Sequence, residues 1–173
     1  DRILKELWGA ESVLIPGQIT DVHHTQELKG LPDFIELSRQ KTGILFGASA
    51  AIGAILGGRK AGNGVEKWRE FGINLGITYQ FSDDLLELMG TDITNKSVEE
   101  YRNKKIIYDL GNLDEVVEVR EVFVARSRLI LENIGRERFR GVARYFNGMN
   151  NLFMERFNYE KALEGYNRLK EMR

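Results

Sequence analysis

The chain has 173 residues, of which 42% are hydrophobic and 29% are charged. This length and composition suit one packed domain and argue against disorder. The 25 Lys and Arg residues nearly balance the 26 Asp and Glu residues, so the chain lacks the broad positive field that nucleic acid or an anionic membrane attracts. Cysteine is absent, which excludes disulfides and thiolate metal sites and fits a reducing, cytoplasmic compartment.

Apolar residues recur at three- and four-residue spacing along the whole chain, and only Pro16 and Pro32 interrupt the pattern. No segment shows the alternation typical of a strand, so the sequence predicts an all-α fold. Glycine-rich breaks separate the expected helices, but none is long enough for a domain linker and no repeat is present. Residues 1–173 are therefore expected to form a single helical domain. In chain order, we expect helices at residues 2–25, 31–57, 64–87, 97–110, 113–134, 138–157 and 159–172.

The start of the chain and its longest apolar stretch give no sign of targeting or stable membrane insertion. The first residue is Asp1 rather than Met, residues 4–10 already have helical periodicity, and no basic-then-apolar leader is present. We expect the chain to begin partway through a longer protein. Residues 42–58 carry no charge but are too few to span a membrane, and their Gly, Ala and Ser content predicts a buried core helix.

The helix expected at 64–87 ends in a cluster of carboxylates. Asp83 and Glu87 lie four residues apart and share a face, and Asp84 is rotated by about 100° from Asp83. Tyr79 and Gln80 lie one turn earlier and border these acids. Like charges among apolar residues are costly unless a cation lies between them, and Mg²⁺ favours carboxylate and phosphate oxygens. The cluster is therefore a candidate Mg²⁺ site, with a solvated acidic helix end as the alternative.

A similar acidic pattern, Asp-Glu-Val-Val-Glu, occurs at residues 114–118. We interpret it as the exposed first turn of a helix, where the helix dipole favours negative charge. The cluster at 83–87 differs because Gly72 and Gly76 precede it on one helix face. These positions without side chains allow a neighbouring helix or a bulky ligand to approach closely.

Lys41 and Thr42 directly precede a run of small and apolar residues at 43–54. An ammonium group and a hydroxyl at one end of an apolar helix suit a phosphate better than they suit a core. Taken alone, Lys41 also fits a surface lysine whose stem packs on apolar neighbours while its head reaches water.

The order and spacing of these segments resemble the trans-isoprenyl diphosphate synthase (polyprenyl synthase) family, which includes farnesyl and geranylgeranyl diphosphate synthases. The resemblance covers roughly residues 17–96 and implies an antiparallel helical bundle of the isoprenoid synthase type, incomplete at its N-terminus. The matching segments are Gly17-Gln18-Ile19-Thr20-Asp21, Lys41-Thr42-Gly43, Phe71-Gly72-Ile73-Asn74-Leu75-Gly76, Tyr79-Gln80, Asp83-Asp84-Leu85-Leu86-Glu87, Gly90-Thr91-Asp92-Ile93 and Asn95-Lys96.

The resemblance implies that an allylic prenyl diphosphate is joined to isopentenyl diphosphate by Mg²⁺-assisted ionisation, condensation and proton loss. It makes Asp83 and Asp84 the metal ligands of the family's second aspartate-rich motif, with Glu87 at a position that is usually Asp. Lys41 and Lys96 would contact diphosphate. The remaining site residues are Thr42, Tyr79 and Gln80, which would line the allylic and acceptor pocket, and Gln18 and Asp21, which match an active-site glutamine and acid one helix earlier.

The sequence departs from the family in three places. The first aspartate-rich motif, and the basic residues that grip isopentenyl diphosphate, have no counterpart. The Gly- and Lys-containing loop after the second motif is also missing, because Leu88-Met89 runs directly into Gly90. Glu87 replaces aspartate but keeps an oxygen ligand. One acidic cluster cannot hold the family's set of Mg²⁺ ions, so residues 1–173 alone are not expected to be a competent enzyme, and product length is undetermined.

Two other functions fit parts of the sequence. The missing first motif fits a non-catalytic partner subunit or decayed homologue that modulates a complete prenyl synthase, but a structural bundle has no need to retain the full set of polar site residues. A carboxylate-bridged metal bundle is suggested by Asp21, His23, His24 and Glu27, but the Glu-x-x-His repeats of such bundles are absent. The prenyltransferase interpretation is therefore favoured. The broad apolar helices also predict a homodimer.

Overall fold

The computed structural model describes residues 2–23, 27–58, 63–89, 112–135 and 139–171. Every regular element in these ranges is helical, which confirms the all-α prediction. The helix expected at 97–110 lies outside the described residues, and the others end close to their predicted ends. The elements are Arg2–His23 (α1), Leu31–Ser38 (α2), Arg39–Gly43 (η2, a π-helical turn), Ile44–Leu56 (α3), Asn63–Met89 (α4), Leu113–Ile134 (α7), Arg140–Arg156 (α8) and Tyr159–Glu171 (α9).

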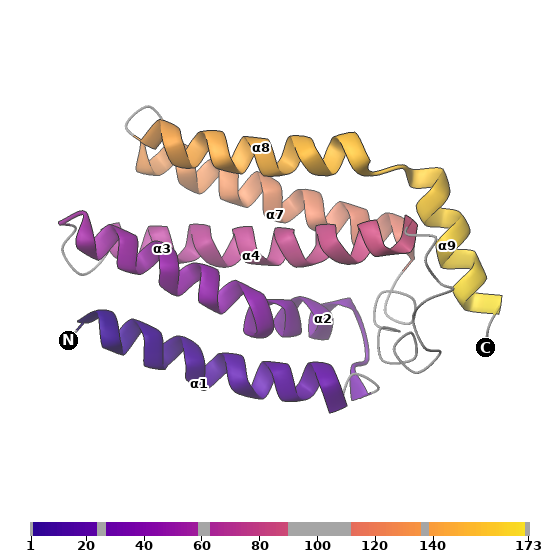
Figure 1. The fold of residues 1–173 in the computed structure, drawn as a ribbon, viewed down its shortest axis with the longest axis horizontal. Helices are drawn as coiled ribbons and strands as arrows, with labels where there is room; N and C mark the ends of the chain where they lie inside the picture. The colour runs from indigo at the N-terminus through magenta and orange to yellow at the C-terminus, as the bar shows by residue number, and fades with distance from the viewer. Residues whose placement is uncertain (1, 24–26, 59–62, 90–111, 136–138, 172–173) are drawn as a thin grey trace.

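The helices form an antiparallel bundle around α4. Figure 1 shows α1, α3, α4, α7 and α8 aligned along the long axis of the molecule, with the chain reversing direction from each to the next and α9 crossing the end where α4 terminates. The most extensive contacts of α4 are with α3 and α7, whereas α1 packs on α3 and η2. No helix within the described ranges combines the length and apolar composition that crossing a membrane requires.

Glycines allow α3 and α4 to approach each other closely. A Cβ atom at Gly76 would lie 2.7 Å from the Cα atom of Gly43, and a Cβ atom at Gly72 would overlap the carbonyl oxygen of Phe46. Real Cβ atoms do not come this close to backbone, so only glycine permits this contact. The prediction that Gly72 and Gly76 admit a close neighbour is therefore confirmed, and the neighbour is the end of η2 with the first turn of α3.

The expectation of a buried core helix at residues 42–58 is only partly correct. Gly47, Ala48 and Ala51 are buried on one side of α3. On its other side, Leu45 is 44% exposed and Leu56 is 71% exposed. The small residues therefore reflect close approach to α4 on one face rather than burial all round.

Two hydrophobic clusters hold α4 along its length. The cluster near its C-terminal end includes Phe81 and Leu85, which are fully buried, together with residues of α2, α7 and α9. The cluster near its N-terminal end includes Trp68 and Phe71 with residues of α3, α7 and α8. Burial of apolar side chains at both ends restricts rotation of α4 about its axis. The polar residues between Phe81 and Leu85 are thereby held in fixed directions.

Candidate active site

A π-helical turn at Arg39–Gly43 joins α2 to α3 and carries two of the predicted site residues. The N–H of Ile44 donates to the carbonyl of Arg39, five residues earlier, which is the hydrogen bond that defines a π-turn. Such turns occur frequently at functional sites. Helix α1 lies against this turn, since a Cβ atom at Gly17 would be 2.7 Å from the Cβ atom of Gln40. The turn therefore brings Lys41 and Thr42 to a junction of α1, α3 and α4.

Lys41 connects this turn to α1. Its Nζ donates to Oδ1 of Asp21 at 2.8 Å, and its side chain is only 11% exposed. The amide nitrogen of Gln18, one turn earlier in α1, donates to the carbonyl oxygen of Lys41 at 3.3 Å. A surface lysine of the kind considered in the sequence analysis would extend its ammonium group into water instead of forming a largely buried ion pair. The structure therefore brings together three of the predicted site residues, one on the turn and two on α1.

Thr42 connects the same turn to α4. Its hydroxyl donates to Oε1 of Gln80 at 2.9 Å, and Nε2 of Gln80 donates to both carboxylate oxygens of Asp84 at 3.1 Å. Both ends of the Gln80 amide are thus used. Two series of hydrogen bonds therefore start from adjacent residues of this turn. One links Lys41 to α1, and the other links Thr42 through Gln80 to Asp84.

Burial changes the ionisation of Asp84. Burial raises its pKa from 3.8 to about 6, and the nearby charges of Glu87 and Asp83 act in the same direction, while Lys41 and the hydrogen bond from Gln80 oppose them. Its neighbour Glu87 lies in the last turn of α4, where the helix dipole disfavours negative charge. An additional cation would therefore stabilise the ionised form of Asp84.

The three carboxylates at 83–87 differ in environment. Asp83 is exposed, whereas Asp84 and Glu87 are half-buried. Among the residues that the structure describes, no three His, Asp or Glu side chains are grouped to enclose a metal ion. Their chemistry still fits Mg²⁺, because this ion is usually held by one or two carboxylates together with substrate phosphate and water rather than by an all-protein cage.

The other predicted site residues lie apart from these hydrogen bonds or outside the described ranges. Tyr79 is 46% exposed, and its ring stacks on that of Phe46 with centroids 5.9 Å apart. The sequence interpretation missed Phe46, which faces Tyr79 because α3 and α4 are so close. Lys96 and residues 90–95 lie outside the described residues, as does His24 of the alternative metal bundle.

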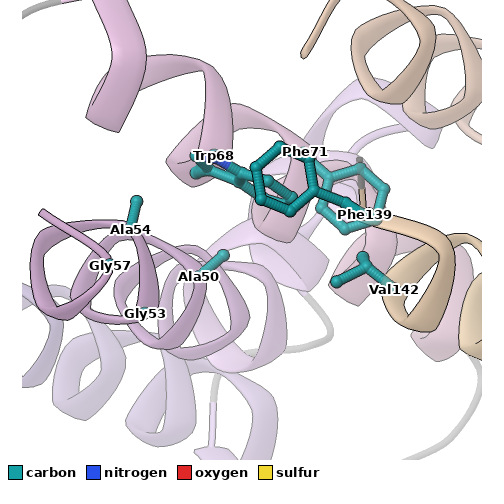
Figure 2. A pocket seen from close by; sticks show the side chains of 8 residues that line it. All are labelled: Ala50, Gly53, Ala54, Gly57, Trp68, Phe71, Phe139 and Val142. Carbon is teal, nitrogen blue, oxygen red and sulfur yellow. The ribbon is translucent and has the colours of Figure 1, made fainter. Parts of the chain in front are cut away.

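An apolar pocket lies near the other end of α4 (Figure 2). Its volume is about 370 Å³, and the rings of Trp68 and Phe139 meet edge to face within it at a centroid distance of 4.9 Å. Trp68 precedes Asp84 by a helical rise of about 24 Å, so the pocket is not part of the polar site. The lining residues are Ala50, Gly53, Ala54 and Gly57 of α3, Trp68 and Phe71 of α4, and Phe139 and Val142 at the start of α8.

Comparison with known sequences gives one matching family and several relatives. Residues 2–108 match the family described as polyprenyl synthetase. The chain is 35% identical over 82 residues to a geranylgeranyl diphosphate synthase of Saccharolobus solfataricus, covering 46% of the chain and 24% of that protein. It is 32% identical over 89 residues to a geranylfarnesyl diphosphate synthase of Methanosarcina mazei, covering 51% of the chain and 30% of that protein. The matched segments thus span less than a third of either relative.

Two solved structures have a similar arrangement of helices. A geranyltranstransferase from Methanosarcina mazei superposes with a TM-score of 0.55 at 25% identity, over 77% of the chain and 46% of that structure. A polyprenyl synthase from Roseobacter denitrificans superposes with a TM-score of 0.61 at 21% identity, over 77% of the chain and 57% of that structure. At this identity, the second likeness concerns the fold alone.

Proposed function

The chain belongs to the polyprenyl synthetase family and has its all-α isoprenoid synthase fold, and from this premise we propose that the protein joins an allylic prenyl diphosphate to isopentenyl diphosphate. The observation that carries the proposal is the convergence of α1, η2 and α4 on one polar site. Lys41 and Thr42, adjacent on one turn, reach Asp21 on one side and the Gln80–Asp84 pair on the other. The two relatives named above are synthases of prenyl diphosphates.

We propose that Asp83, Asp84 and Glu87 hold Mg²⁺ together with the diphosphate of the allylic substrate. Their oxygen chemistry suits this ion. The raised pKa of Asp84, about 6, marks a carboxylate whose ionisation a bound cation favours. When bound, Mg²⁺ neutralises the charge that builds on diphosphate as it leaves. The carboxylates supply only part of an ion-binding shell, and phosphate oxygens would complete it.

The remaining polar residues would bind and orient the substrates. Lys41 would donate to diphosphate, and its ion pair with Asp21 keeps the ammonium group near the turn until a phosphate competes for it. Gln80, fixed by Thr42, would hold Asp84 in place. Gln18, Tyr79 and Lys96 complete the proposed substrate-binding set. None of these residues need act as a nucleophile. The double bond of isopentenyl diphosphate attacks the allylic carbon as diphosphate leaves with the electrons of the C–O bond, and the cation so formed loses a proton that the diphosphate oxygens can accept.

Assembly and location are part of the same proposal. Several apolar side chains along α1 are exposed, including Trp8 (67% exposed), Ile15 (58%) and Val22 (56%). A second copy of the protein would cover this surface in a homodimer. The absence of cysteine suits a cytoplasmic location. Sedimentation of the full-length protein at micromolar concentration tests the dimer, and a monomer mass would overturn that part.

The activity is tested with the full-length protein, an allylic diphosphate, radiolabelled isopentenyl diphosphate and Mg²⁺. We expect a longer prenyl diphosphate to form, and we expect EDTA to abolish its formation. Failure to extend any of the dimethylallyl, geranyl, farnesyl or geranylgeranyl diphosphates would overturn the catalytic proposal. A non-catalytic subunit would then be the better interpretation, and it would change the product length or rate of a complete synthase when the two are mixed.

A further inference from the structure

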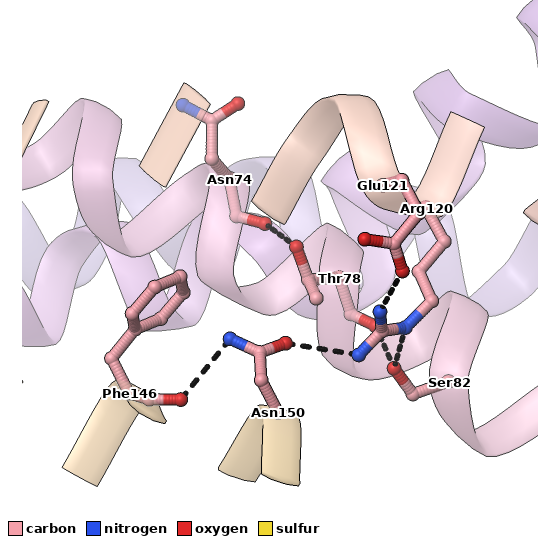
Figure 3. A network of polar contacts seen from close by, with 7 residues as sticks. All are labelled: Asn74, Thr78, Ser82, Arg120, Glu121, Phe146 and Asn150. Atoms are coloured by element: carbon pink, nitrogen blue, oxygen red, sulfur yellow. Dashed lines mark hydrogen bonds and ion pairs between the residues drawn. The ribbon is translucent and has the colours of Figure 1, made fainter. Parts of the chain in front are cut away.

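A buried guanidinium group lies on the side of α4 that faces α7 and α8 (Figure 3). Arg120 of α7 is only 1% exposed. Its Nε donates to Oγ of Ser82 at 2.8 Å, and its Nη2 donates to Oδ1 of Asn150 at 2.9 Å. The guanidinium carbon lies 3.7 Å from the ring centroid of Phe153. One side chain of α7 therefore joins α4 to α8.

The partners of Arg120 are themselves fixed by the backbone. The hydroxyl of Ser82 donates to the carbonyl of Thr78 at 2.7 Å, which leaves its lone pairs for Arg120. The amide nitrogen of Asn150 donates to the carbonyl of Phe146 at 3.1 Å, which leaves its oxygen for the same guanidinium. Each acceptor thus has one orientation in which it satisfies both its backbone bond and Arg120.

This arrangement costs free energy that an apolar side chain would not require. The carboxylate of Glu121 pairs with Nη1 of Arg120 and supports its charge, but Glu121 is half exposed, and burial still lowers the pKa of Arg120. The other contacts of the guanidinium are neutral oxygens and the ring of Phe153. Replacing a buried charge by a well-packed apolar group is often neutral or stabilising. Stability alone does not account for an arginine here. A planar guanidinium with several fixed donors does, however, fix the relative position of the helices that carry its acceptors.

The contact of Arg120 with α4 lies at the helix turn that carries the proposed metal ligands. Ser82 directly precedes Asp83 and Asp84, and its side chain is rotated by about 200° from that of Asp84. On one side of α4, Gln80 and Asp84 are connected to Thr42. On the opposite side, Ser82 is connected to Arg120. The last turns of α4 are therefore held from both sides by hydrogen bonds.

We propose that Arg120 is a positioning residue, which acts through Ser82 to set the rotation of the last turns of α4 and hence the directions of the Asp83 and Asp84 carboxylates. The inference rests on the proposed function, because it assigns those carboxylates to a shared Mg²⁺–diphosphate site. Supporting residues of this kind affect metal affinity strongly, since ligands displaced by less than an ångström bind poorly.

The test uses the full-length protein and two readouts. The first is the Mg²⁺ concentration that gives half of the rise in melting temperature caused by Mg²⁺ with inorganic diphosphate, which requires no turnover. The second is the Mg²⁺ concentration that gives half-maximal prenyl transfer. The variants are Arg120→Met, Ser82→Ala and the double variant. The matched control is Arg126→Met, because Arg126 is an exposed arginine of α7 that also lies over a phenylalanine ring, that of Phe123.

We expect Ser82→Ala and Arg120→Met to raise both Mg²⁺ midpoints about tenfold, and saturating Mg²⁺ to restore most of the turnover. The double variant should melt no lower than Arg120→Met, because Oγ of Ser82 is then no longer left without its donor and only Oδ1 of Asn150 is, yet keep the raised midpoints. Arg126→Met should leave both midpoints unchanged. If the single variants lower the melting temperature but leave both midpoints at the parent values, Arg120 is only structural and the inference is wrong.

The two proposals can fail separately. A parent protein with no prenyl transfer but a diphosphate-dependent Mg²⁺ midpoint that Ser82→Ala raises would overturn the activity and support the positioning role. Normal prenyl transfer by the parent, together with unchanged Mg²⁺ midpoints in the variants, would support the activity and overturn the positioning role. Should Arg120→Met fail to fold, Ser82→Ala alone decides, because it removes one oxygen and no charge.

Discussion

Residues 83–87 and 114–118 each place three carboxylates within five positions of a helix, but the two acidic segments lie at opposite helix ends. The first lies near the C-terminal end of α4 and the second begins α7. At the start of α7, the side chain of Asn112 accepts from the N–H of Glu115 at 2.9 Å, and the carboxylate of Glu115 accepts from the N–H of Asn112 at 3.4 Å. The acids of this segment are exposed at the start of α7, as the sequence predicted, and Glu115 is in addition part of a helix cap.

The difference teaches that position on the helix and burial, rather than the number of acids, indicate a cation site. The dipole at the N-terminus of α7 already compensates its exposed acids. At the end of α4 the dipole is unfavourable, and burial raises the pKa of Asp84 to about 6. We therefore expect a bound cation to stabilise the segment at 83–87 more than the segment at 114–118. The following predictions test that contrast, beginning with the largest effect.

Loss of one carboxylate should affect turnover only in the first segment. We expect Asp84→Asn to lower the rate of prenyl transfer by at least about a hundredfold, because several kcal/mol of charge stabilisation depend on the metal ligands. The matched variant Asp114→Asn should stay within about twofold of the parent, since it removes an exposed carboxylate whose partner is the hydroxyl of Tyr159. Steady-state rates at saturating substrates measure both. Equal losses in the two variants would remove the basis for distinguishing the segments.

The stability contribution of Asp84 should depend on pH. Its folded-state pKa is raised from 3.8 to about 6, so the folded protein holds this proton more tightly than the unfolded chain does. The contribution is complete below the unfolded pKa and is lost as pH rises through about 6, by up to about 3 kcal/mol. Urea unfolding of the metal-free parent and Asp84→Asn should therefore show the parent losing stability relative to the variant between about pH 4 and pH 7. Parallel curves would contradict the burial of a titrating carboxylate.

The close approach of η2 and α3 to α4 brings Thr42 to Gln80, and it can be disturbed at Gly76. A Cβ atom there would lie 2.7 Å from the Cα atom of Gly43, so we expect Gly76→Ala to cost about 1–3 kcal/mol of unfolding free energy. Gly148→Ala in α8 is the control, because no atom lies within 4 Å of its added Cβ. That substitution should be neutral or stabilise by up to about 1 kcal/mol. Urea denaturation of both variants measures the difference, and a stabilised Gly76→Ala would exclude the packing described.

The second segment should contribute to stability and not to turnover. Removing the cap of α7 with Asn112→Ala should cost about 1 kcal/mol of unfolding free energy, because the N–H of Glu115 loses its acceptor. The rate of prenyl transfer at 25 °C should be unchanged. Chemical denaturation and steady-state kinetics on the same preparation check both statements. A fall in turnover without a loss of stability would assign the second segment a role in catalysis.

Local signals made most of the helices predictable. Asn112 caps α7, and Gly135 ends it in the left-handed conformation at φ 105°, so both ends follow from residues beside them. The burial of α3 was only partly predicted, because Gly and Ala are common both in buried helices and in helices that approach one partner closely. The exposure of Leu45 and Leu56 shows that α3 is of the second kind.

Contacts between residues far apart in the chain could not be predicted from the sequence. Lys41 pairs with Asp21 across 20 positions, and Thr42 bonds to Gln80 across 38. Each pairing starts from the π-turn, which packs against both α1 and α4. The partnership of Arg120 with Ser82 was also missed, although the polar residues Asn74, Thr78 and Ser82 at four-residue spacing in an apolar helix were a visible signal.

The central claim is that residues 83–87 bind divalent cations together with diphosphate. Its most direct test is Mn²⁺ binding by the full-length protein, followed by electron paramagnetic resonance with and without inorganic diphosphate. We predict diphosphate-dependent binding in the parent and in Asp114→Asn, and its loss in Asp84→Asn. Undiminished binding by Asp84→Asn would contradict the account.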